Sequence, residues 1–74
     1  MCNNIVMEKF IKRLKELRIE KGITQVQLAK TTGLSASAIS SWENNTRVPN
    51  ALAIITLARF FEVTTDYLLG ESDF

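Results

Sequence analysis

The sequence contains no histidine, one cysteine and three glycines, and each scarcity excludes a class of protein. Without histidine or a group of cysteines, the usual ligand sets for zinc and related metals cannot be assembled. The commonest general base of enzymes is also missing, and no glycine-rich loop is available to hold a phosphate. We therefore expect no metal, no cofactor and no enzymatic activity.

The chain also lacks any long apolar run that would suggest a membrane span. Cys2 has no second cysteine with which to form a disulfide, and no segment resembles a secretory signal. Hydrophobic residues make up 46% and charged residues 23% of 74 residues, a profile typical of one globular domain. These features predict a cytoplasmic, single-domain protein over residues 1–74, with no membrane partner and no evident small-molecule ligand.

Positive and negative charges nearly balance, and the net charge is only +1. The charges are nevertheless unevenly distributed. Residues 8–21 hold six lysines and arginines against three glutamates, whereas the acids gather near the C-terminus. This basic segment can steer phosphate groups, or it can be an ordinary solvated helix face. For Lys9, Lys12 and Lys15 the sequence favours the solvated face.

What the sequence does contain is a pair of helix signals between Thr24 and Glu43. Thr24 and Gln27 have the spacing of a capping box, and Gly33 can supply the positive φ that ends a helix. Ser35 then has the position of a second N-cap. The pattern predicts helices over 25–32 and 36–44, joined by a tight turn.

Apolar spacing predicts three further helices, over about 8–21, 51–61 and 65–69, with Asn50 and Thr64 as N-caps and Gly70 as a terminator. Residues 1–7 lack a clear period and are expected to be a frayed lead-in. In the fourth helix, Leu52, Ile55 and Phe60 are expected to widen the apolar stripe. No segment has the alternation of a strand, so the fold class is all-α.

In this order the motifs resemble one known family. They are Leu14, Leu17, Arg18, the GITQ and QLA of residues 22–29, the Gly-Leu-Ser turn, Ile39, Trp42-Glu43-Asn44, Pro49 and the closing VTTDYLLG. The set is similar to phage-repressor and Cro-like (XRE-type) helix-turn-helix domains. The resemblance covers about residues 10–70 and implies a five-helix, lambda-repressor-like domain whose second and third helices form the helix-turn-helix, at about 24–43.

The resemblance also implies which residues contact double-stranded DNA. A recognition helix reads bases through its outward face, and the corresponding residues here are Ala36, Ser37, Ser40 and Ser41. The family often has longer polar side chains there, whereas serine bonds to any base edge and alanine can only touch a thymine methyl. Specificity is therefore expected to be modest or to rest on DNA shape. The alternative is that the serines are only a solvated face.

Phosphate contacts are expected beside this helix. Gln25 and Ser35 stand at helix starts, where backbone N–H groups favour anions. By resemblance, the loop after the recognition helix also binds the DNA backbone, through Asn44, Asn45, Thr46 and Arg47. Arg47 is expected to be the strongest contact, because no other cation lies between Lys30 and Arg59. Asn45 has a second interpretation, as the left-handed residue that ends the helix.

Arg18 continues the apolar stripe of the first helix, so its guanidinium needs a partner. Glu43 is the one acid between Lys21 and Glu62, and the resembling family pairs an arginine with a glutamate at these places. We expect a largely buried ion pair between Arg18 and Glu43. The alternative is two independent surface charges.

By resemblance, the protein is expected to be a transcriptional regulator, most simply a repressor, that binds operator DNA as a homodimer. The apolar residues left over for a dimer face are Phe60, Leu69 and Phe74. The alternative function is a protein-interaction module on the same scaffold, antitoxin-like or polymerase-binding, with weak or no DNA binding. The observation that supports this alternative is that the outer face formed by Ser37, Ser40 and Ser41 carries no charge.

Overall fold

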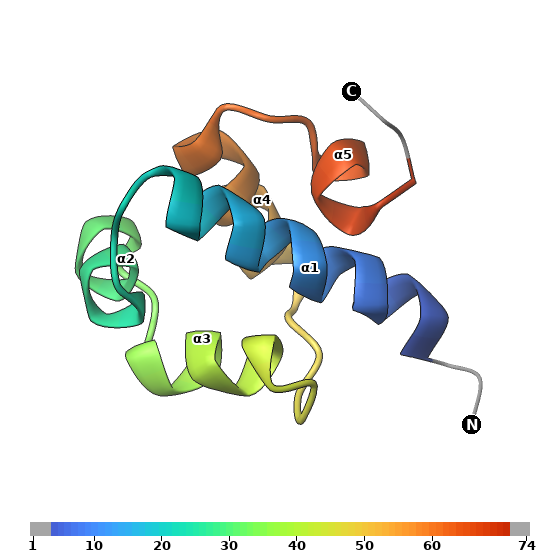
Figure 1. Cartoon of the computed structure of the whole chain (residues 1–74), viewed down its shortest axis with the longest axis horizontal. Helices are drawn as coiled ribbons and strands as arrows, with labels where there is room; N and C mark the ends of the chain where they lie inside the picture. The colour runs from blue at the N-terminus through green and yellow to red at the C-terminus, as the bar shows by residue number, and fades with distance from the viewer. Residues whose placement is uncertain (1–3, 72–74) are drawn as a thin grey trace.

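The computed structural model describes the backbone of residues 4–71 and the side chains of residues 8–71. This part of the chain contains five α-helices and no strand, as the sequence predicts (Figure 1). The helices are α1 (Asn4–Glu20), α2 (Gln25–Thr32), α3 (Ala36–Glu43), α4 (Ala51–Phe61) and α5 (Thr65–Leu69).

The start of α1 differs from the prediction. The helix begins at Asn4 rather than near Glu8, so most of the expected lead-in is helical. No proline or glycine lies between residues 4 and 8 to interrupt the backbone hydrogen bonds. The prediction, which relied on the spacing of apolar residues, therefore placed the start of α1 too late in the sequence.

The predicted caps are present. Thr24 and Gln27 form a reciprocal capping box, with the Gln27 amide donating to Thr24 Oγ1 at 3.0 Å and the Thr24 amide donating to Gln27 Oε1 at 2.8 Å. Ser35, Asn50 and Thr64 each accept one backbone N–H at the start of α3, α4 and α5. These side chains satisfy donors that a helix start would otherwise leave unpaired.

The core forms where all five helices meet. Its fully buried side chains are Phe10, Leu14, Leu28, Ile39, Leu57 and Leu68. Trp42 is also buried, as a core residue rather than as an exposed aromatic platform. Burial of such apolar side chains is the main driving force for folding in a domain this small.

The prediction that Leu52 and Ile55 widen the apolar stripe of α4 is wrong. Leu52 is 70% exposed and Ile55 is 40% exposed, whereas Ile54 is buried. At 3.6 residues per turn, Leu52 lies about 160° around the helix from Ile54, so the two cannot face the same core. Phe60 is half-buried and packs against the core.

The arrangement of the helices gives the molecule two distinct sides. α1 contacts both α3 and α5, and α2 contacts both α3 and α4. Figure 1 shows α3 below α1, α5 above it, and α4 crossing behind it. Within the described residues, no helix is long and apolar enough to cross a membrane.

Candidate nucleic-acid interface

The candidate site is built on α3, which is held against the core by its inner face. Gly33 adopts a φ of 79° and ends α2, so the chain turns sharply and Ser35 begins α3. Ile39 and Trp42 are buried beneath the helix. An eight-residue helix is not stable by itself, so this packing fixes the direction in which its outer face points.

The four residues expected to read bases differ in accessibility. Ser37 is exposed, whereas Ser40 and Ser41 are half-buried. Ala36 is half-buried and packs partly against the core. The Ser40 hydroxyl accepts a hydrogen bond from Asn44 Nδ2 at 3.4 Å. The outer face of α3 is therefore small, polar and without formal charge.

The loop after α3 is exposed but well ordered by hydrogen bonds. Both the amide and the hydroxyl of Thr46 donate to the Ser41 carbonyl, at 2.9 and 3.2 Å. Asn45 has a φ of 62°, the left-handed conformation anticipated as its second interpretation. Arg47 follows this turn with an exposed side chain, so the loop presents its guanidinium just beyond the C-terminal end of α3.

Arg18 and Glu43 form a bidentate ion pair between α1 and α3. Arg18 Nε donates to Glu43 Oε2 at 2.8 Å, and Nη2 donates to Oε1 at 3.0 Å. Glu43 is only 4% exposed, while Arg18 is half-buried and also donates to the Ile23 carbonyl at 3.0 Å. The hydrogen bond that Arg18 donates to Glu43 raises the pKa of the Arg18 guanidinium, against a smaller opposing effect of burial.

Gln25 joins this network, which the sequence did not predict. Its Nε2 donates to Glu43 Oε1 at 3.1 Å, so one hydrogen of the amide is already engaged within the protein. Gln25 is the first residue of α2 and Glu43 is the last residue of α3. The bond therefore brings the start of α2 beside the end of α3, where the Asn44–Arg47 loop begins.

The feature of the sequence that could have indicated the contact between Gln25 and Glu43 was the expected burial of Glu43. A carboxylate with little exposure needs several donors, and Gln25 is a donor at the start of the neighbouring helix. Sequence spacing gives no distance between residues 18 positions apart, so the bond is visible only in the folded chain.

The expected dimer face lies only partly on the accessible surface. Phe60 is half-buried, with its ring centroid 5.0 Å from that of Phe61. Leu69 is also half-buried and packs against the core, and Phe74 lies outside the described residues. More exposed apolar side chains occur in the loop before α4 and in its first two turns. They are Val48, Leu52 and Ile55, here called the α4 ridge.

Comparison with known proteins gives consistent matches. A helix-turn-helix family model matches residues 14–68. The chain is 41% identical over 62 residues to the HTH-type transcriptional activator BcrR of Enterococcus faecalis, covering 84% of this chain and 30% of that protein. It is 36% identical over 62 residues to the HTH-type transcriptional regulator ImmR of Bacillus subtilis (strain 168), covering 84% and 49%.

A phage protein is also similar. Repressor protein C2 of Salmonella phage P22 is 33% identical over 69 residues, which cover 93% of this chain and 30% of that repressor. The chain thus spans half or less of the length of these three relatives. Because the family model extends over most of the chain and these relatives are transcriptional regulators, the protein belongs to the helix-turn-helix family of phage-repressor and Cro-like (XRE-type) regulators.

Proposed function

We propose that this protein binds double-stranded DNA and regulates transcription, with α3 inserted in the major groove. The observation that carries the proposal is the network around Glu43. It joins the start of α2 to the end of α3 through Gln25 and fixes both to α1 through Arg18. A helix held in this way can enter a groove while its neighbours contact the two flanking phosphate strands.

Base contacts are assigned to the outer face of α3. Ser37 is the most accessible of the four proposed residues, and Ser40, Ser41 and Ala36 follow on the same side. Serine hydroxyls donate to or accept from any base edge, so these contacts discriminate weakly. The proposal therefore predicts that DNA shape and deformability contribute much of the sequence preference.

Phosphate contacts are assigned to the loop after α3 and to the starts of α2 and α3. Arg47 supplies a full charge, while Asn44, Asn45 and Thr46 supply polar groups on the same exposed loop. Gln25 contributes through the amide hydrogen that Glu43 does not engage, and Ser35 lies at the start of α3. Backbone N–H groups and the positive end of a helix dipole favour an anion at such a position.

A homodimer completes the proposal. One recognition helix covers only a few base pairs, and half-sites one turn apart are separated by about 34 Å. The domain measures 32 × 26 × 21 Å, so two copies at that spacing are close enough to touch. The α4 ridge is a better candidate for the dimer contact than the Phe60 and Leu69 face. Its side chains are more exposed, so a dimer through the ridge would bury more apolar surface.

Repression is the simplest outcome of such binding, because a protein on an operator blocks access to it. The similar proteins include one named activator and one named repressor, so a reporter assay with the operator upstream of the promoter must establish the direction.

The second candidate function is a protein-interaction module with weak DNA binding. The observation in its favour is the uncharged outer face of α3, which would bury against another protein at little desolvation cost. The exposed Arg47 loop favours DNA.

Arg47→Ala tests the choice between these functions, with Arg59→Ala as the matched control. Both arginines are exposed and both changes remove one charge. Binding is measured by fluorescence anisotropy on a duplex from upstream of the protein's own gene, and on a scrambled duplex, over a salt series. Arg47→Ala should weaken binding on both duplexes and reduce the slope of log affinity against log salt by about 1. Arg59→Ala should change neither.

Absence of binding by the unmodified protein to both duplexes at low salt would contradict the DNA-binding proposal and support the protein-interaction module. Equal effects of the two alanine variants would contradict the assignment of Arg47 as a phosphate contact.

A further inference from the structure

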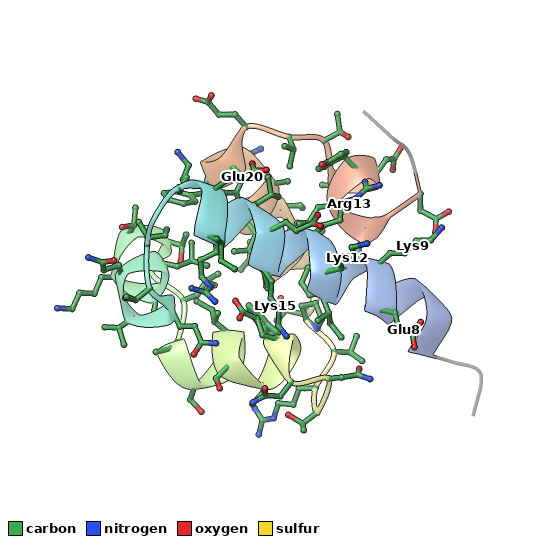
Figure 2. The ribbon with its side chains drawn as sticks, viewed as in Figure 1. Glu8, Lys9, Lys12, Arg13, Lys15 and Glu20 are labelled. Carbon is green, nitrogen blue, oxygen red and sulfur yellow. The ribbon has the colours of Figure 1, made fainter. Side chains whose placement is uncertain are left out.

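A basic hollow lies between α1 and α5, on the side of α1 away from α3. Lys9, Lys12 and Arg13 are spaced at i, i+3 and i+4, so they share one face of the helix. Together with Glu16 and with Tyr67 of α5, they line an open hollow of about 370 Å³. Figure 2 shows the three basic side chains on the part of α1 that lies nearest α5. Nothing in the proposed DNA contact uses this hollow.

Two of the three basic side chains contact residues at α5. The Arg13 guanidinium lies over the Tyr67 ring, 4.0 Å from its centroid, and Nη1 donates to the Tyr67 carbonyl at 2.6 Å. The stem of Lys9 lies against Gly70, where even a Cβ atom would not fit. A ligand that binds here therefore meets an arginine side chain that has already lost much of its freedom.

The hollow carries an excess of positive charge. Lys9 and Lys12 are exposed, and within the described residues neither has a carboxylate at ion-pair distance. Glu16 is the one acid among the lining residues, so even without Arg13 the two lysines leave the lining with more positive than negative charge. The site thus favours an anionic ligand.

The location argues against the DNA duplex as that ligand. α3 and α5 both contact α1, and Figure 1 shows them on opposite sides of it, so the hollow beside α5 lies away from the proposed recognition helix. A duplex is stiff over a length of about 150 base pairs, and it cannot bend around a domain only 32 Å long. A flexible chain with negative side chains can reach the hollow while the duplex occupies α3.

The spacing of the two lysines indicates the form of the ligand. Side chains three residues apart on a helix have Cβ atoms about 5–6 Å apart. In an extended peptide, residues i and i+2 lie on the same side, about 6.6 Å apart. We propose that this hollow binds an acidic peptide segment of a partner protein, with Lys9 and Lys12 contacting carboxylates on alternate residues. Arg13 and Tyr67 form the rigid wall against which the segment lies.

Fluorescence anisotropy with a labelled Gly-Glu-Gly-Glu-Gly peptide at low salt tests the proposal. A Gly-Gln-Gly-Gln-Gly peptide is the uncharged control. Lys12→Glu is compared with Lys15→Glu, because both lysines are exposed on α1 and both changes alter the net charge equally, but only Lys12 lines the hollow. Lys12→Glu should weaken binding of the acidic peptide roughly twofold to fivefold, the size expected for exposed charges, and Lys15→Glu should leave it nearly unchanged.

Three results would overturn the proposal. They are no binding of the acidic peptide by the unmodified protein, equal weakening by the two variants, and displacement of the peptide by duplex DNA. Displacement by DNA would show that the hollow belongs to a nucleic-acid surface. Binding of peptide and duplex at the same time supports a separate site, and this test does not depend on the identity of the operator.

Discussion

Among the described residues, Glu43 is the charged side chain that is buried. Its carboxylate is buried and receives hydrogen bonds from Arg18 and Gln25, which stand on two other helices. A buried charge is stable only when it is paired and hydrogen-bonded. The pair adds little net stability compared with an apolar substitute, but it makes the position of α3 depend on α1 and α2.

Replacement of Arg18 by Met should therefore be strongly destabilising. The change leaves the Glu43 carboxylate buried without its main partner, at a cost of about 3–5 kcal/mol in the free energy of unfolding. Thermal unfolding followed by circular dichroism measures the effect, with Lys15→Met on the exposed side of α1 as the control. The double variant Arg18→Met with Glu43→Leu should recover much of the loss. An unchanged melting temperature in the single variant would refute the structural importance of the pair.

At the scale of helices, short local signals determine where each helix ends. How closely two helices pack depends on the size of the side chains between them. Gly33 and Gly70 both end a helix with a left-handed φ, of 79° and 83°. Their surroundings differ, because a Cβ on Gly33 would meet open space whereas one on Gly70 would collide with the Lys9 stem. Gly70 thus serves both as the terminator of α5 and as the place where α5 contacts α1.

Alanine at Gly70 should accordingly cost more stability than alanine at Gly33. The left-handed conformation costs about 1–2 kcal/mol at either position, and only Gly70→Ala adds the collision with Lys9. Chemical denaturation gives the free energy of unfolding of each variant under the same conditions. Equal losses would mean that the end of α5 moves away from α1 without cost, and would argue against the close contact seen here.

At the scale of the whole molecule, the three candidate binding surfaces lie on different parts of the domain. α3 and the Arg47 loop lie on one side of α1, the basic hollow lies toward α5, and the α4 ridge is exposed next to the Arg47 loop. The ridge has only three large apolar side chains, whereas stable dimers bury about 800 Å² on each partner. A dimer through this ridge should therefore form mainly when both copies are bound to DNA.

Leu52→Asp should separate folding from cooperative binding. Leu52 is 70% exposed, so the melting temperature should change little. Binding to a duplex with two half-sites should lose its cooperativity, while affinity for a single half-site should stay the same. Phe60→Ser is the matched variant of the alternative dimer face. Anisotropy titrations on one-site and two-site duplexes measure both quantities, and loss of cooperativity only in Phe60→Ser would contradict the ridge as the interface.

Much of the fold could be predicted because its signals are local. The Thr24 capping box, the N-caps Ser35 and Asn50, and the terminator Gly33 act within a few residues, so spacing alone located four of the helices closely. The start of α1 was placed too late because a helix can continue past the end of its apolar period. Leu52 was assigned to the core because apolar character does not say which way a side chain faces.

The sequence by itself determined the number of helices, their caps and the positions of the turns, since these depend on neighbours in the chain. It also identified the family, through the order of its motifs. Only the tertiary structure decided that Gln25 bonds to Glu43, that the α4 ridge is exposed, and that Lys9, Lys12 and Arg13 meet Tyr67 in one hollow. These features depend on the angles at which helices pack, and long-range packing is a property of the whole chain rather than of any local segment.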